Sequence, residues 1–395
     1  MKKRLLAVLI VVAISSNCYA QQNFLDTIWS GGIMRTFKVY IPAIYDSQTP
    51  RPLVFLFHGL GENASIMENL SKFRSVADTA NFILVSPNGT VGTVFPAGFG
   101  QSWNNFDFDA VDDVLFVSNL IDTLVGTYNI DTSRIYSAGY SNGGFMGYDL
   151  ACRLSHRIAA IASVSGSIDI TRFPTCDPGR EVPVMEIHGT NDSTVPYDGG
   201  SFAGIDFLSV DTIINYWIDN NQCNNSPVIT ELPDIDPSDG SSITEYMYMD
   251  CANETEVLLL KVLDGTHTWP GSSEFGSNQD IIADQEIWRF FLRHKLPASI
   301  TSTSAIIPDL EYSIYPNPAS SFLNVSWGES QKMYAPDELL ISDLYGRIVL
   351  VQQLEGNGPI NQVTINLHKL PSGFFVLFSK HDGQLSALEK FIVTK

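Results

Sequence analysis

Short apolar runs alternate with longer amphipathic segments along the first three quarters of the chain. Apolar runs ended by Gly, Pro or Asn are typical of buried strands, and apolar residues that recur every three or four positions are typical of helices. The runs predict strands at 35–42, 52–59, 82–89, 134–141, 158–166, 182–189 and 257–265. Helical spacing is found at 67–80, 111–128, 145–152 and 210–221. This alternation predicts an α/β fold, a mainly parallel sheet with helices on both faces.

The pattern changes after Pro297. Residues 298–311 are rich in Ser, Thr and Ile without a helical period, which favours a linker. Over 312–395 short strand-like pieces are separated by turns, and these predict a small antiparallel β-domain with the layout of a sandwich.

The first twenty residues have the pattern of an export signal. Met1–Arg4 is basic, Leu5–Ile14 is an unbroken apolar run, and small residues precede a cleavage site near Ala20. We therefore expect a signal peptide at 1–20 and an α/β domain at 21–297. No later segment reaches the roughly 20 continuous apolar residues of a membrane-spanning helix, so we expect an exported mature chain without a spanning segment.

The charge balance argues against one class of partner. The 395-residue chain carries a net charge of −20, and removal of the three basic signal residues would take it to −23. A strongly acidic protein repels the phosphate backbone, so nucleic acid is not expected as a partner. The acidic residues are spread without long runs, which is typical of a solvated surface.

Four cysteines remain after removal of the signal peptide. An even number in an exported protein favours two disulfides, and three pairings are open. We favour the nearest neighbours, which pair Cys152 with Cys176 and Cys223 with Cys251. The chain has no Cys-x-x-Cys motif or Cys/His cluster, so no structural metal site is expected.

One turn between a strand and a helix carries a candidate nucleophile. In "RIYSAGYSNGGFMGYDLAC", Ser141 lies between Gly139 and Gly143 where the predicted strand becomes a helix. Glycines there allow the tight turn and the close approach of helix to strand that a nucleophile elbow needs. The Gly-x-Ser-x-Gly pattern alone also occurs by chance. Its position between a strand and a helix in an α/β chain is what favours Ser141 as a nucleophile over an ordinary turn serine.

A serine hydroxyl needs a base, and the base needs a carboxylate to orient it. In this architecture the acid and then the base follow the serine along the chain. Asp192 lies on the loop after the strand that ends at His188, and His267 lies on the loop after the strand 257–265. Asp198 is the competing acid, but it lies further along a Gly-rich loop where a turn Asp is common.

The same reaction needs two N–H donors for the oxyanion. We expect the backbone amide of Asn142, directly after the nucleophile, and that of Leu60 or a close neighbour, in the loop after the strand 52–59. Two tryptophans near these loops, Trp103 and Trp269, are substrate-binding candidates; for each of them core packing is an equally open alternative.

Six stretches carry a resemblance to a known family. They are "FHGLGENAS", "GYSNGGFMGYDLAC", "IAAIASVSG", "HGTNDSTVPY", "NNQC" and "DGTHTWPG". Over about 24–297 they resemble the secreted polyhydroxybutyrate depolymerase and feruloyl or acetylxylan esterase family of α/β-hydrolases. The resemblance implies a triad of Ser141, Asp192 and His267, and it implies the pairing of Cys223 with Cys251.

The C-terminal segment resembles the type A sorting domain of type IX secretion substrates, through "YSIYPNPASSFLNV", "DLYGRIV", "INLHKLPSGFFVLF" and "KFIVTK". That resemblance implies the type IX secretion machinery as a partner. It also implies passage through the periplasm, followed by release or attachment at the cell surface.

Together these features predict a secreted serine esterase that needs no metal or organic cofactor. Its substrate would be a small or polymeric ester, with feruloyl or acetyl esters of plant polysaccharide first and polyhydroxyalkanoate second. Two alternatives stay open: a surface carbohydrate-binding protein without catalysis, and a secreted serine peptidase that uses the same triad.

Overall fold

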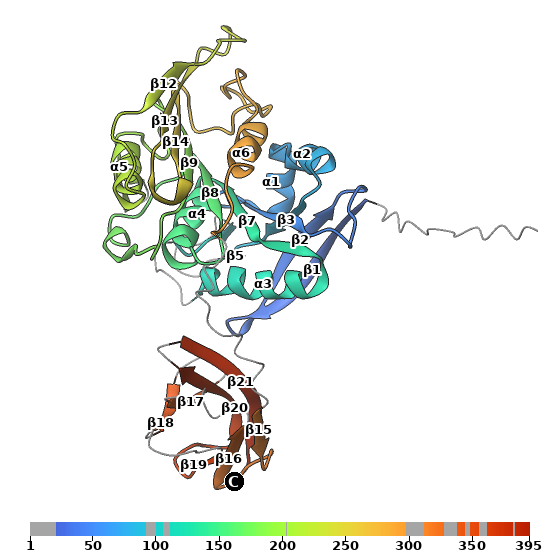
Figure 1. Cartoon of the computed structure of the whole chain (residues 1–395). Coiled ribbons are helices and arrows are strands. Elements are labelled where there is room, and N and C mark those ends of the chain that lie inside the picture. The colour runs from blue at the N-terminus through green and yellow to red at the C-terminus, as the bar shows by residue number, and fades with distance from the viewer. Residues whose placement is uncertain are drawn as a thin grey trace, which may run out of the picture. The chain divides into compact units, whose positions relative to one another are not determined.

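The computed structural model divides the chain into two compact units, Met1–Ser299 and Ile300–Lys395 (Figure 1). The predicted signal peptide, 1–20, and the predicted linker, 298–311, lie outside the residues that it describes. Those residues are 21–91, 100–105, 111–202, 204–297, 312–327, 338–343, 348–354, 362–381 and 384–395.

The described part of the first unit is built on a ten-stranded sheet. Its strands, in spatial order, are β1 (Gln22–Ser30), β2 (Ile33–Ile41), β4 (Ile83–Pro87), β3 (Arg51–Phe57), β7 (Ile130–Tyr140), β8 (Ala160–Val164), β9 (Val184–Gly189), β14 (Val257–Leu263), β13 (Ser242–Tyr248) and β12 (Val228–Glu231). Neighbours from β4 to β14 run parallel, and the strands at both edges pair antiparallel. The predicted α/β class with a mainly parallel sheet is confirmed.

Two edge regions were not predicted. β1 is mostly exposed and β12 is exposed throughout, so neither has the continuous apolar pattern of a buried strand. β13 pairs with both β12 and β14, which extends the sheet beyond the predicted strands. Two short antiparallel strand pairs are separate from this sheet: β5 (Thr90–Val91) pairs with β6 (Gln101–Ser102), and β10 (Gly200–Phe202) pairs with β11 (Ile205–Phe207).

Helices cover both faces of this sheet. They are α1 (Ala64–Leu70), α2 (Phe73–Ala80), α3 (Asp113–Thr127), α4 (Asn142–Arg153), α5 (Val210–Asn220) and α6 (Ala283–Phe291). The region 67–80, which the sequence predicts as one helix, is two helices. The backbone amide of Lys72 donates to the Asp284 carboxylate at 2.8 Å, and this contact replaces a bond within a continuous helix.

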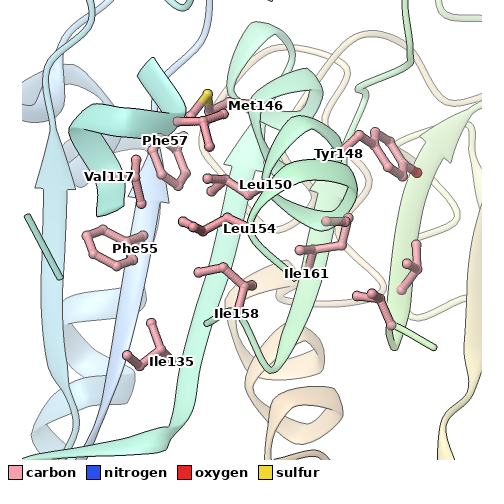
Figure 2. Packing of buried hydrophobic residues seen from close by; sticks show 14 of the residues in the cluster. Phe55, Phe57, Val117, Ile135, Met146, Tyr148, Leu150, Leu154, Ile158 and Ile161 are labelled. Carbon is pink, nitrogen blue, oxygen red and sulfur yellow. The ribbon is translucent and has the colours of Figure 1, made fainter. Parts of the chain in front are cut away.

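The alternation of side chains along β3 divides the core in two. Phe55 and Phe57 pack with α3, α4 and α5, whereas Val54 and Leu56 pack with α1, α2 and α6. Figure 2 shows the first of these clusters from close by, with Met146 and Leu150 of α4 on the side of Phe57 and Tyr148 on the other side. Helix α4 is buried along almost its whole length, and it is thereby held firmly against the sheet.

The described part of the second unit is antiparallel β-structure. One sheet contains β15 (Tyr312–Tyr315), β16 (Phe322–Trp327) and β19 (Gln362–Asn366), and the other contains β18 (Ile348–Gln353), β17 (Glu338–Asp343), β20 (Gly373–His381) and β21 (Gln384–Val393). Leu323, Ile341 and Leu377 belong to a separate core of this unit. The predicted all-β class of the C-terminal segment is confirmed.

Candidate active site

Four loops that follow parallel strands carry the candidate residues. The carboxyl ends of parallel strands lie along one edge of a sheet, and ligands bind there in open α/β folds. Leu60 follows β3, Ser141 follows β7, Asp192 follows β9 and His267 follows β14. Because β3, β7, β8, β9 and β14 are successive neighbours, these four loops share that edge.

Ser141 lies at a sharp turn with no intervening loop. β7 ends at Tyr140 and α4 begins at Asn142, while Ser141 itself has φ 52° and ψ −120°. A non-glycine residue rarely adopts a positive φ, so the surrounding structure must hold this conformation. A Cβ atom at Gly139 would overlap the carbonyl oxygen of Gly143, and one at Gly143 would overlap that of Phe57. Both glycines are therefore required by close backbone approach.

Ser141, His267 and Asp192 form one hydrogen-bonded series. The His267 Nδ1 atom lies 2.7 Å from Asp192 Oδ2, and Nε2 lies 3.0 Å from Ser141 Oγ. A carboxylate only accepts, so Nδ1 carries the hydrogen and Nε2 is free to accept from the serine hydroxyl. The structure thus brings together all three residues that the sequence singles out, from positions up to 126 residues apart.

Asp192 is held as an ionised acceptor. Its Oδ1 atom accepts the backbone N–H groups of Thr194 and Val195, each at 2.8 Å. Burial opposes the ionisation of Asp192. The hydrogen bond from His267 and the electrostatic attraction to that ring outweigh burial, so the pKa of Asp192 is lower than its usual value. The competing acid, Asp198, is exposed further along the same loop.

The loop after β3 is fixed by His58. His58 Nε2 accepts the N–H of Gly89 at 2.9 Å, so Nδ1 carries the hydrogen and donates to Gly59 O at 2.8 Å. Burial lowers the pKa of His58 to about 4, which keeps this ring neutral. The Nε1–H of Trp103 donates to the carbonyl of His58 at 2.9 Å.

Two backbone amides remain available at this edge. Among the described residues, no backbone or side-chain acceptor is found for the N–H of Leu60 or of Asn142, whereas the amides of Gly59 and Gly61 are bonded to Glu62 and to Gln101 O. The Asn142 amide is in the first turn of α4, where the helix dipole also favours negative charge. Within the described ranges, the amides of the two predicted oxyanion donors therefore have no acceptor.

Both substrate-binding candidates are buried. Trp103 is 1% exposed and Trp269 is 0% exposed, so neither indole can form an open pocket wall in this structure. The backbone N–H of Trp103 donates to Asn142 Oδ1 at 2.8 Å, and Asn142 Nδ2 donates to the backbone carbonyl of Trp103 at 3.3 Å. Trp269 donates from Nε1 to Asp284 at 3.0 Å. The burial of both indoles favours the core-packing alternative in this structure.

Tyr140 is a site residue that the sequence reasoning did not single out. Its hydroxyl donates to the carbonyl of His267 at 2.9 Å, and its ring lies beside the imidazole with centroids 5.2 Å apart. Burial, with the nearby carboxylates of Glu274 and Glu62, raises the pKa of Tyr140, so the hydroxyl stays a donor. Its position inside the Gly-x-Ser-x-Gly turn was an available signal.

Two disulfides brace this unit. Cys152, near the end of α4, is bonded to Cys176, and Cys223 is bonded to Cys251. These are the nearest-neighbour pairs favoured from the sequence. The first bond ties the helix that begins at the nucleophile to the loop after β8.

Within the ranges that the structure describes, no group of three or more His, Cys, Asp or Glu side chains is arranged to hold a metal ion. No described helix is both long and apolar enough to cross a membrane.

Comparisons with known proteins find two families and several esterases to which the chain is similar. Residues 41–204 match the phospholipase/carboxylesterase family, and residues 313–394 match the secretion system C-terminal sorting domain. Feruloyl esterase D of Neurospora crassa is 27% identical over 265 residues, which are 66% of this chain and 83% of that protein. A bifunctional acetylxylan esterase/xylanase of Neocallimastix patriciarum is 30% identical over 166 residues.

The chain spans 22% of the length of the bifunctional enzyme, and that match covers 42% of the chain. Among solved structures, an acetyl xylan esterase from Aspergillus awamori aligns with a TM-score of 0.49 and 12% identity, over 68% of this chain and 99% of that one. The family match and the sequence relatives support a carboxylic ester hydrolase of the α/β-hydrolase fold. The sorting domain indicates export, with secretion or surface attachment.

Proposed function

We propose that this chain hydrolyses esters with Ser141 as nucleophile. Its residues 41–204 match the phospholipase/carboxylesterase family, and residues 313–394 match the secretion sorting domain. His267 is the general base and Asp192 orients it. The observation that carries the proposal is the continuous series of contacts from Ser141 Oγ through His267 to Asp192, at 3.0 and 2.7 Å.

In the first half of the reaction, Ser141 Oγ attacks the carbonyl carbon of the ester while its proton passes to His267 Nε2. The amides of Leu60 and Asn142 donate to the oxyanion that forms, and they need little rearrangement because they are held in fixed backbone. His267 then gives its proton to the leaving alcohol oxygen as the C–O bond breaks. An acyl-enzyme on Ser141 remains.

In the second half, water attacks the acyl carbon and passes a proton to His267. The ester bond to Ser141 breaks, Ser141 Oγ regains a proton from His267, and the carboxylic acid leaves. Asp192 is ionised throughout, since its pKa is held below its usual value, and its negative charge stabilises the imidazolium that forms twice in each cycle.

For the substrate we propose a feruloyl or acetyl ester of plant polysaccharide. Support comes from the relatives, one named a feruloyl esterase and one an acetylxylan esterase/xylanase. A sorting domain that leads to secretion or surface attachment also fits a polymer that cannot enter a cell. Polyhydroxyalkanoate is the second substrate class.

The test uses the purified protein and its Ser141→Ala variant with p-nitrophenyl acetate, methyl ferulate, acetylated xylan and polyhydroxybutyrate in parallel. We expect the wild type to release acid from at least one of the first three and the variant to lose that release by about 10³-fold or more. A folded wild type that hydrolyses none of the four would contradict the proposal and favour the peptidase or carbohydrate-binding alternative. Equal rates in wild type and variant would contradict the role of Ser141.

A further inference from the structure

A second imidazole and a second carboxylate lie buried behind Asp192. Glu186 and His188 both come from β9, two residues apart, so their side chains share one face of the strand. They are 1% exposed each. His188 Nδ1 lies 2.8 Å from Glu186 Oε1, and His188 Nε2 lies 3.5 Å from Asp192 Oδ2. The catalytic series of Ser141, His267 and Asp192 does not use either residue.

The contacts of this pair determine where its protons lie. His188 Nε2 is 2.8 Å from the carbonyl oxygen of Val195, which can only accept, so Nε2 carries a hydrogen. Tyr148 donates its hydroxyl hydrogen to Glu186 Oε2 at 2.7 Å. One further proton is shared between His188 Nδ1 and Glu186 Oε1. The pair is neutral as a whole, with its N–H end at Asp192 and its carboxylate end away from it.

The surroundings of the pair are closed. Tyr148 reaches it from α4, and Figure 2 shows this side chain on the side of the helix opposite to Leu150. Tyr197 lies edge-on to His188, with ring centroids 5.9 Å apart, and donates its hydroxyl hydrogen to Asp211. On the neighbouring strand β14, Lys261 is opposite His188 in register, but its Nζ atom lies over the Tyr197 ring at 4.4 Å.

A polar pair in this position costs stability unless every group is bonded, because burial removes its hydration. Burial raises the pKa of Glu186. For His188 burial acts to lower the pKa, but the hydrogen bond and charge of Glu186, together with Asp192, outweigh it and raise the pKa above its usual value. In either arrangement of the shared proton, His188 keeps its Nε2–H directed to Val195 O and facing Asp192.

We propose that Glu186 and His188 are positioning residues that hold Asp192 and its loop toward His267 and thereby set the lower pH limit of catalysis. His188 acts from two sides, since its Nε2–H bonds Val195 O and faces Asp192 Oδ2, while Val195 N–H bonds Asp192 Oδ1. Neither residue touches the reacting atoms. This inference rests on the proposed triad and extends it by one pair.

The direction in which loss of the Glu186–His188 pair shifts the pH dependence follows from electrostatics. Catalysis needs a neutral imidazole at His267, and the rate falls at the acid side where this ring is protonated. The Nε2–H of His188 turns the positive end of its dipole toward Asp192, and it opposes a positive charge on the other side of that carboxylate. Loss of the pair removes that opposition, so the acid limb of kcat/KM moves to higher pH.

The test compares the full chain with three single variants, Glu186→Gln, His188→Gln and Tyr148→Phe, using p-nitrophenyl acetate from pH 5 to 9. We expect the acid limb of kcat/KM to move to higher pH by about half a unit or more in the first two variants. The shift should be smaller in Tyr148→Phe, which removes only one hydrogen bond. kcat should fall while KM stays close to that of the wild type, because no atom of the pair meets the substrate.

His294→Gln is the matched control. His294 Nε2 lies 2.9 Å from Glu256 Oε1, and this pair is also buried. It lies toward the opposite edge of the sheet, because Glu256 directly precedes β14 whereas His267 follows the end of that strand. The His294→Gln substitution therefore removes a similar buried contact that does not involve Asp192. The acid limb of kcat/KM in this variant should equal that of the wild type.

A second readout is the rate at which a fluorophosphonate labels Ser141 across the same pH range, with circular dichroism to confirm folding. Labelling needs the same neutral His267 but no particular ester, so it tests the pair even where the ester substrate fails. An acid limb that is unchanged in the folded variants, or that moves equally in His294→Gln, overturns the inference. Absence of both hydrolysis and labelling in the wild type contradicts the proposed function instead.

Discussion

At the scale of single residues, the site depends on an unfavourable backbone conformation that is held in place by contacts with adjacent backbone. Ser141 holds a positive φ, and its N–H donates to Val164 O at 2.8 Å, which ties the turn to the adjacent strand. With Gly139 and Gly143 in contact with other backbone, the hydroxyl of a nearly buried serine is kept in reach of His267. Strain of this kind is maintained by the packing around it.

Asp192→Asn tests the orienting carboxylate. The amide can place an N–H against His267 and thereby favour the wrong tautomer, so we expect kcat for p-nitrophenyl acetate to fall by about 10³-fold or more with little change in KM. Asp198→Asn, the exposed competitor on the same loop, is the matched control and should keep wild-type kcat. Equal losses in the two variants would speak against Asp192.

Gly143→Ala tests the close approach of α4 to β3. The added methyl group would overlap the carbonyl oxygen of Phe57, so we expect the free energy of unfolding to fall by about 3 kcal/mol in urea titrations. Gly126→Ala is the control. Nothing lies within 4 Å of a Cβ at this position in α3, so that change should be neutral or stabilise by up to about 1 kcal/mol. Similar losses in both variants would contradict the argument.

At the scale of elements, one carboxylate connects three segments around the catalytic loops. Asp284, in the first turn of α6, accepts from the Lys72 amide that begins α2 and from Trp269, two residues after His267. The sequence pattern predicts helix over 67–80, but not the break between α1 and α2, because that break depends on a partner 212 residues away.

Asp284 gives a pH prediction. Burial raises its pKa to about 6, so between about pH 4 and pH 6 the folded chain retains a proton that the unfolded chain releases. The contribution of this carboxyl to stability is therefore present at low pH and is lost as the pH rises through that window. In urea titrations, the unfolding free energy of Asp284→Asn should rise relative to wild type by on the order of 2–3 kcal/mol from pH 4 to pH 7. A constant difference would contradict the shift.

At the scale of the whole molecule, two cores are separate. Every contact described for the catalytic series lies in the first unit, and the cluster around Leu323 and Ile341 belongs to the second alone. The proposed roles divide in the same way, with ester hydrolysis in the first unit and the sorting signal in the second. The exact boundaries predicted at 21–297, 298–311 and 312–395 stay predictions.

A fragment of residues 21–299 tests this division. Because its core and site are complete within the first unit, we expect kcat/KM for p-nitrophenyl acetate within about twofold of the longer chain. In cells, a fragment of residues 1–299, which keeps the predicted signal peptide, should no longer reach the surface or the medium, since it lacks the sorting domain. A fragment that folds but hydrolyses the ester more than tenfold more slowly would show that the second unit contributes to catalysis.

Much of the site could be read from the chain because catalytic residues in this fold follow strands, and buried strands have a local apolar pattern. Ser141, Asp192 and His267 each follow such a run. Glu186 and His188 are also recognisable in the sequence, because they are two polar residues on the same face of a strand that is otherwise apolar. Trp103 and Trp269 could not be assigned, because a sequence position beside a loop does not fix where the side chain points.

The sequence by itself determined the α/β class, the order of the strands and helices of the sheet core, and the residue types available for chemistry, since these follow from local hydrophobic periodicity and turn-forming residues. The tertiary structure decided which strands are neighbours, which tryptophans are buried, and that Ser141 and His267 meet at 3.0 Å across 126 residues. Strand pairing, burial and buried hydrogen bonds are non-local, because their free energy depends on what the rest of the chain places beside them.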